Sequence, residues 1–346
     1  METRRDAIKE SNQLGSRKFI TKPQHDNNVL LFIAIHPDKV NEIGYIKFSK
    51  KKGIVELTNY NAWLSGKTLG IGSTSKIGKD HLAGYHGEGY KVAALALFRE
   101  RYTVRIKASE CDWKFLEAAE GTQCAGELCV RIRRENAKKI LKLKEAHALN
   151  ISEGLPRLRK GNVWEDVTFE IGGRKGRLVD EAEFMEWIKF ALELDPPSKV
   201  LETRKGSLIL DPKFDNKIFL QGILLEESSF SSSKFKFGYD LAQGRANRDR
   251  TRLSSTEMQR RLIAEIWAEA IKKDPTLSTT YTDMLQSHQA PADVDGADRL
   301  ISIETARKIW GNLSSKDSGR KVFFYDSRAG EKVCQIKRIG GSGCSH

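Results

Sequence analysis

The sequence predicts a mixed α/β protein: an α/β sandwich of the α+β class, followed by a second α/β domain. Short apolar runs that suit buried strands stand between stretches with the period of about 3.6 residues that is typical of helices. These elements lack the regular alternation that a doubly wound parallel sheet requires. The length of 346 residues favours two domains over one.

The first half of the chain holds most of the strand signals. The continuous apolar run 29–35 suits a buried strand, and residues 45–48 and 54–57 read as a hairpin around the basic turn 50–53. A glycine-rich segment then precedes an apolar run that can start a helix. In chain order, we expect a helix at 6–14, strands at 29–35, 45–48 and 54–57, a helix at 92–99, strands at 102–108 and 129–133, and a helix at 134–148.

A polar segment at 151–160 separates the two predicted domains. Pro196 and Pro197 would end a helix, because proline cannot continue one. We therefore predict a first domain over residues 1–160, a second α/β domain over 161–275 and a C-terminal extension of helix and strand over 276–346. The elements expected after residue 160 are a strand at 163–171, a glycine-rich turn at 172–176, a helix at 181–192, strands at 207–210, 218–225 and 234–239, helices at 258–272 and 301–313, and a strand at 321–325.

The charge of the chain points to an acidic partner. Lysine and arginine number 59 against 46 aspartates and glutamates, which gives a formal net charge of +13. A nucleotide, a nucleic acid or an acidic protein surface would suit this balance. The basic residues are spread over several runs, and such runs are also common as solvated faces.

The composition indicates an intracellular protein, cytoplasmic or nuclear. No apolar run approaches the roughly 18 residues of a membrane span. Residues 1–6 lack the apolar core of a signal peptide. The five cysteines are odd in number and form no C-x-x-C pair, so they indicate neither a disulfide framework nor a zinc site. We expect no membrane partner.

The most informative motif is the glycine-rich segment 84–91, in which Gly84, Gly87 and Gly89 stand before an apolar helix start. Glycine lets the backbone approach a ligand closely, and the free N–H groups of a helix N-terminus attract phosphate. His86 and Lys91 lie in the same segment. The segment therefore indicates a phosphate-binding loop, although the same pattern also occurs as a structural turn.

The order of motifs around this loop resembles the GHKL ATPase family, which includes gyrase, the large heat-shock chaperones, histidine kinases, MutL and the MORC proteins. A strand that ends at Asn59 is followed by the glycine and hydroxyl cluster 69–76 and then by the glycine loop. The MORC-like and chaperone-like branches are the most similar. The resemblance covers roughly residues 1–135 and implies a Bergerat-type fold that binds ATP, with magnesium as a possible second cofactor.

The resemblance also implies roles for residues around the glycine loop. The first family motif reads D-x-G-x-G, and its aspartate accepts a hydrogen bond from the adenine amine; here Asn59 replaces that aspartate, and neither glycine is present. An asparagine carbonyl can accept the same bond without its charge assistance. The residues that would surround the nucleotide are Asn59, Gly72, Ser73, Ser75, Lys76, Gly84, His86, Gly87, Gly89 and Lys91.

The N-terminal motif of the family, E-x-x-x-N-x-x-D-A, can be matched in two registers. One aligns residues 6 and 7 with its D-A end and places the glutamate before Met1. The other aligns Glu10 with the glutamate that activates water and puts Leu14 where asparagine binds magnesium. We prefer the second register. Magnesium would then need a neighbour such as Gln13, which shares a helical face with Glu10, or Asn12, which does not.

The second domain resembles the transducer domain of the chaperone, MutL and MORC-like branches. In those proteins a residue of this domain reaches the terminal phosphate, and the candidates here are Gln221, Arg248 and Arg250. The resemblance implies a conformational switch that binds ATP, with possible hydrolysis by Glu10 and a possible homodimer. The alternative is a degenerate scaffold that binds nucleic acid or protein without nucleotide.

Overall fold

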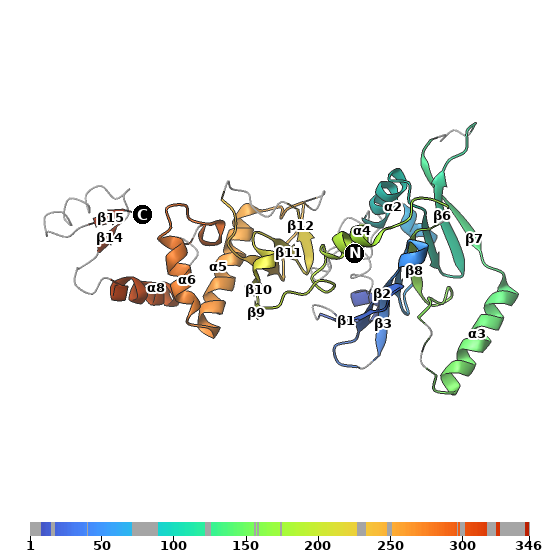
Figure 1. The fold of residues 1–346 in the computed structure, drawn as a ribbon, viewed down its shortest axis with the longest axis horizontal. Helices are drawn as coiled ribbons and strands as arrows, with labels where there is room; N and C mark the ends of the chain where they lie inside the picture. Colours follow the sequence, from blue (N-terminus) through green and yellow to red (C-terminus); the bar gives the residue numbers. More distant parts are fainter. Residues whose placement is uncertain are drawn as a thin grey trace. The chain divides into compact units, whose positions relative to one another are not determined.

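The computed structural model divides the chain into two compact units, which are described separately below (Figure 1). The first contains residues 1–196 and 220–224, and the second contains residues 197–219 and 225–346. The structure describes residues 8–14, 18–39, 41–70, 89–121, 126–155, 157, 159–173, 175–226, 233–247, 251–295, 297, 302–316, 323–325 and 343–345.

The first unit is built on an eight-stranded sheet in which every pair of neighbouring strands is antiparallel. The order across the sheet is β1-β2-β3-β4-β8-β5-β6-β7. Its strands are β1 (Ile20–His25), β2 (Val29–Ile35), β3 (Glu42–Ser49), β4 (Ile54–Asn59), β5 (Val104–Ala108), β6 (Cys111–Glu117), β7 (Leu128–Arg134) and β8 (Val167–Gly172).

One face of this sheet is covered by helices α2 (Gly89–Arg99) and α4 (Glu181–Ile188). Val55 and Leu57 of β4 pack in one apolar cluster with Phe184 of α4, because alternate residues of a strand point to the same face. Ala94 of α2 packs in the neighbouring cluster over β5 and β6. A further helix of this unit, α3 (Ala137–Ser152), follows shortly after β7.

The observed strand pairing moves the predicted domain boundary. β8 was expected in a second domain that begins at residue 161, yet it pairs with β4 on one side and β5 on the other. It therefore completes the first sheet, and the first unit extends to residue 196. Pro196 and Pro197, which were expected to end a helix, stand at the change between the units.

The second sheet has the strand order β12-β11-β13-β10-β9. In the second unit, helices α5 (Thr256–Lys273), α6 (Leu277–Leu285) and α8 (Ile303–Lys316) follow the strands. Trp267 of α5 donates to the hydroxyl of Tyr239 at 2.8 Å, and Tyr239 in turn bonds the buried carboxylate of Asp293. The strands are β9 (Val200–Glu202), β10 (Gly206–Ile209), β11 (Ile218–Leu220), β12 (Ile223–Leu225) and β13 (Gly238–Leu241), and β14 (Phe323–Tyr325) pairs separately with β15 (Gly343–Ser345).

The fold class expected from the sequence is confirmed, because both units combine sheet and helix. The strand at 29–35 and the hairpin around 50–53 are present as expected. The expected strand at 218–225 is divided into β11 and β12. Within the described ranges, no helix is both long and apolar enough to cross a membrane.

Candidate functional site

The candidate site begins at Asn59, the last residue of the central strand β4. Asn59 pairs with Gly44 of β3 and with Val167 of β8, and its side chain is 2% exposed. It lies on the helix-covered face together with Val55 and Leu57, because every second residue of a strand points to the same face. Its side-chain oxygen makes no hydrogen bond in the described part of the chain. A buried acceptor left without a donor costs free energy, so a ligand that donates to it would be favoured.

Asn61 continues the chain beyond Asn59 in a left-handed backbone conformation, with φ of 50°. Asparagine is one of the few residues that enter this region readily. The backbone N–H of Asn61 donates to Oδ1 of Asp166 at 3.1 Å, which holds the turn in place. Asn61 therefore adopts a left-handed conformation that glycine also adopts readily.

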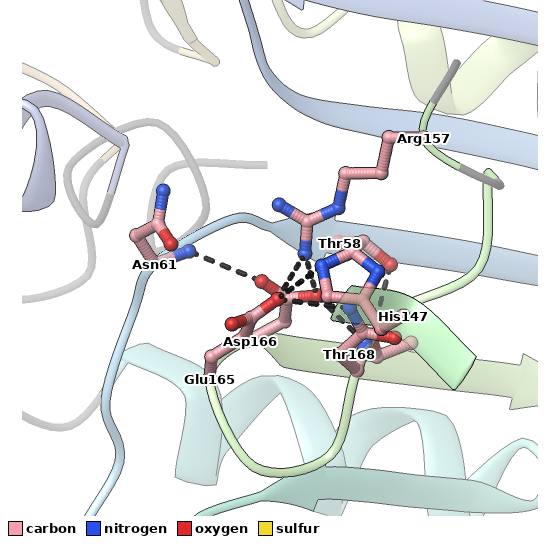
Figure 2. A network of polar contacts seen from close by, with 8 residues as sticks. Thr58, Asn61, His147, Arg157, Glu165, Asp166 and Thr168 are labelled. Atoms are coloured by element: carbon pink, nitrogen blue, oxygen red, sulfur yellow. Dashed lines mark hydrogen bonds and ion pairs between the residues drawn. The ribbon is translucent and has the colours of Figure 1, made fainter. Parts of the chain in front are cut away.

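Asp166, next to the first residue of β8, is the centre of a buried polar network (Figure 2). Besides Asn61, its carboxylate accepts from the backbone N–H of Asn162 at 2.6 Å and from the guanidinium of Arg157 at 2.5 Å. Arg157 also bonds Glu165 at 3.0 Å. Three residues thus make four hydrogen bonds to two adjacent acidic residues and fix the loop beside the end of β4.

The electrostatics of this network are set by burial. Burial raises the pKa of the Asp166 carboxyl, while the N–H of Asn162, the charge of Arg157 and the N–H of Asn61 oppose that rise. The Arg157 guanidinium lies 3.7 Å from the centre of the Tyr60 ring. Burial also raises the pKa of the Tyr60 hydroxyl, and Arg157 lowers it to a smaller extent. The hydroxyl is therefore protonated at neutral pH.

The network reaches α3, and a pair of threonines on the sheet face opposite Asn59 lies beside it. The hydroxyls of Thr58 and Thr168, on the adjacent strands β4 and β8, share a hydrogen bond of 3.0 Å. His147 of α3 lies 3.5 Å from the carboxylate of Glu165. Figure 2 shows these side chains gathered around Asp166. The end of β4 is thus connected by side chains to a helix that is distant in sequence.

The helical segment that carries Glu10 lies on the same face as Asn59. Residues 8–11 are helical, and a Cβ on Gly44 would lie 3.4 Å from Cδ1 of Ile8. Gly44 and Asn59 are register partners, and paired residues of antiparallel strands share a face. The structure thus brings the Glu10 segment and Asn59 to the same end of the sheet.

The structure corrects the expectation for Gln13. The helix ends before it, and Gln13 has φ of 52°, so it does not continue the helical face of Glu10. The N–H of Gln13 donates to the carbonyl of Glu10 at 3.2 Å, and the N–H of Leu14 donates to that of Lys9 at 2.9 Å. This pair of bonds is the Schellman ending of a helix. Gln13 is exposed.

The remaining residues of the N-terminal motif do not fit a magnesium site in the preferred register. Leu14 is buried in an apolar cluster with Ile8 and Ile43. The side-chain amide of Asn12 donates to the carbonyl of Ile8 at 3.0 Å. Over the described residues there is also no group of three histidine, cysteine or acidic side chains that could hold a metal ion. We derive no step that depends on magnesium.

The two ends of the segment 71–88, which contains most of the glycine motif, lie beside each other. The hydroxyls of Thr68 and Tyr90 share a hydrogen bond of 3.0 Å, and the Lys91 ammonium donates to the carbonyl of Gly70 at 2.5 Å. Gly89 is the first residue of α2. The described residues on either side of this segment therefore lie together at the N-terminus of α2, where Lys91 bonds Gly70.

Several expected site residues lie outside the described residues: Gly72, Ser73, Ser75, Lys76, Gly84, His86 and Gly87 of the nucleotide motifs, and Arg248 and Arg250 of the sensor candidates. Gln221 is described. It is buried, has φ of 52° and lies between β11 and β12, in the stretch 220–224 that belongs to the first unit.

Asp166 and Arg157 were not anticipated from the sequence. A single aspartate after a polar segment forms no pattern, and its partner Asn61 lies 105 positions away. The available signal was the polar segment itself, since charged residues that precede a buried strand can cap a neighbouring turn. No protein-family model and no curated protein matches the chain.

Proposed function

We propose that this chain binds ATP at the Asn59 end of the eight-stranded sheet and acts as a GHKL-type conformational switch. The observation that carries the proposal is the buried side-chain oxygen of Asn59, which has no hydrogen-bond partner among the described residues. This oxygen could accept from the exocyclic amine of adenine, as the resemblance implies. Guanine presents a carbonyl at the equivalent position and would leave the acceptor without a donor.

Two further observations support the proposal. Asn61, which the resemblance aligns with the first glycine of the family motif, has a left-handed backbone that glycine also adopts readily. The hydrogen bond between Thr68 and Tyr90 joins the residues that flank 71–88 at the N-terminus of α2, and free N–H groups at a helix N-terminus favour phosphate. In this arrangement the adenine would lie at Asn59 and the phosphates at the N-terminus of α2, and a single stretch of chain connects these two places.

Replacement of Asn59 tests the adenine contact. We expect Asn59→Leu to weaken ATP binding by about 10- to 100-fold, because the adenine amine would lose its acceptor at a buried position. Asn59→Asp keeps an acceptor and should retain binding. Isothermal titration calorimetry with ATP and GTP measures both effects. Asn27→Leu, at an exposed turn residue, is the matched control. An affinity for ATP that is equal in the parent and in Asn59→Leu, or absent in the parent, would contradict the proposal.

Glu10 is our candidate for the general base in hydrolysis. Its helical segment lies on the face that carries Asn59, although the structure assigns no magnesium ligand beside it. We expect Glu10→Ala to retain ATP binding and to release phosphate more slowly by on the order of 100-fold. Glu153→Ala, at an exposed helix end, should behave as the parent. Equal phosphate release in the parent and in Glu10→Ala would remove Glu10 from the mechanism.

A further inference from the structure

A row of cations crosses β5, β6 and β7 on the sheet face that α2 does not cover. Arg105 of β5 is the register partner of Lys114 of β6, and Lys114 is the partner of Arg131 of β7. Ile106 and Trp113, which alternate with these residues, pack in the apolar cluster under α2. The three cations therefore share the opposite face.

Only part of this positive charge is neutralised within the described protein. Asp112 pairs with Arg105, and Glu170 pairs with Lys107. Burial raises the pKa of the Asp112 carboxyl, but the hydrogen bond and charge of Arg105 outweigh that effect and lower it overall. Asp112 is therefore ionised and already engaged near neutral pH.

Three cations of this face form no salt bridge within the described residues, although Asp112, which pairs with Arg105, is the cross-strand register partner of Arg133. Lys114, Arg131 and Arg133 are exposed, and no ion pair joins them to any described residue. Lys114 stands directly opposite Arg131, and like charges in that position destabilise a sheet. The fold retains this repulsion although neither residue contributes to the apolar core. A polyanion on this face would convert the repulsion into attraction.

We propose that this basic sheet face, formed by Lys114, Arg131 and Arg133 with Arg105 at its margin, binds the phosphate backbone of a nucleic acid. Residues 131 and 133 are two apart on one strand, so their side chains repeat along β7 at about 6.5 to 7 Å. A guanidinium can bond a phosphate through two parallel N–H groups. Such contacts position the nucleic acid without reading its sequence.

Helix α3 adds further exposed cations next to this face. It begins three residues after β7, and β6, β7 and α3 follow one another at one end of the first unit (Figure 1). Lys138 and Lys142 of α3 are exposed and likewise have no ion pair within the described ranges. The proposal is independent of ATP binding, because none of these residues contacts Asn59 or belongs to the Asp166 network.

Charge reversal tests the basic sheet face. We expect the full chain to bind a fluorescein-labelled 20-base-pair DNA or a single-stranded RNA of equal length, measured by anisotropy over a salt series. The triple variant Lys114→Glu, Arg131→Glu and Arg133→Glu should bind at least tenfold more weakly. With DNA, its slope of log affinity against log salt should be smaller by about 2 to 3, because each lost phosphate contact removes about 0.9.

The matched control carries the same change in charge elsewhere on the first unit: Lys22→Glu, Lys51→Glu and Lys52→Glu, all at exposed residues. The control should keep the slope of the parent. Circular dichroism and thermal unfolding establish whether each variant is folded. If the glutamate set is not folded, a milder set with glutamine at residues 114, 131 and 133 repeats the test. Equal losses in the two triple variants, no nucleic-acid binding by the parent at low salt, or binding only to anionic lipid vesicles would overturn the proposal.

Discussion

Asp166→Ala is expected to lower the free energy of unfolding of the first unit by about 3 kcal/mol. Removing one member of a buried ion pair costs about 3 to 5 kcal/mol, because the remaining charge stays in a poorly solvated place. Here Arg157 would keep its ion pair with Glu165, so the expected loss of stability lies at the lower end of that range. The backbone N–H groups of Asn61 and Asn162 would also lose their acceptors. Denaturant unfolding followed by tryptophan fluorescence measures the change.

The same variant should weaken ATP binding if Asn59 is the adenine acceptor, because Asn61 would no longer be anchored beside it. Asp26→Ala is the control for loss of an aspartate that accepts a backbone N–H, since Asp26 accepts from Asn28 at an exposed turn. Its cost should stay near 1 kcal/mol or below. A loss in Asp166→Ala no larger than in the control would show that the network does not stabilise the site.

Gly172→Ala should destabilise the first unit by about 3 kcal/mol. Gly172 ends β8 with φ of 85°, a conformation that costs other residues about 1 to 2 kcal/mol. A Cβ at this position would also lie 2.3 Å from the carbonyl oxygen of Gly53 and 3.0 Å from Val179. Relief of that contact would separate β8 from β4, and such overpacking costs a further 1 to 3 kcal/mol or so. Chemical denaturation of the parent and variant provides the comparison.

Gly121→Ala separates the two causes of this loss. Gly121 has nearly the same φ, 86°, but no atom of the described residues lies within 4 Å of an added Cβ. Its substitution should therefore cost only the conformational part, about 1 to 2 kcal/mol. If both variants lost the same stability, the close approach of Gly172 to Gly53 would contribute nothing.

The sequence predicted those elements of the fold whose signal is local. The apolar run of β2 and the basic turn between β3 and β4 each indicate their structure within a few residues. The place of β8 could not be predicted in this way, because strand order depends on pairing between segments more than a hundred residues apart. β1 was missed since most of its residues are exposed and show no alternation.

For the candidate site too, the sequence predicted what depends on local signals and missed what depends on contacts between distant segments. Asn59 could be identified from its position at the end of an apolar strand before a glycine-rich segment. Two features could not be predicted: the burial of its oxygen, which has no hydrogen-bond partner among the described residues, and the support from Asp166. Both depend on β8 lying beside β4. The Gln13 prediction was wrong because it assumed that the helix continues beyond residue 12, whereas the backbone turns there.

The outer strands of the eight-stranded sheet have a consequence for solubility. β1 and β7 end the strand order, and an outer strand offers unpaired backbone groups to the strands of other molecules. Pro23, in the middle of β1, has no N–H to offer, and three arginines, Arg131, Arg133 and Arg134, line β7. Proline and charge at sheet edges oppose aggregation through strand addition. Glutamate at residues 131 and 133 would preserve this protection. Valine at these residues would leave an uncharged, apolar edge strand that can pair with a strand of another molecule.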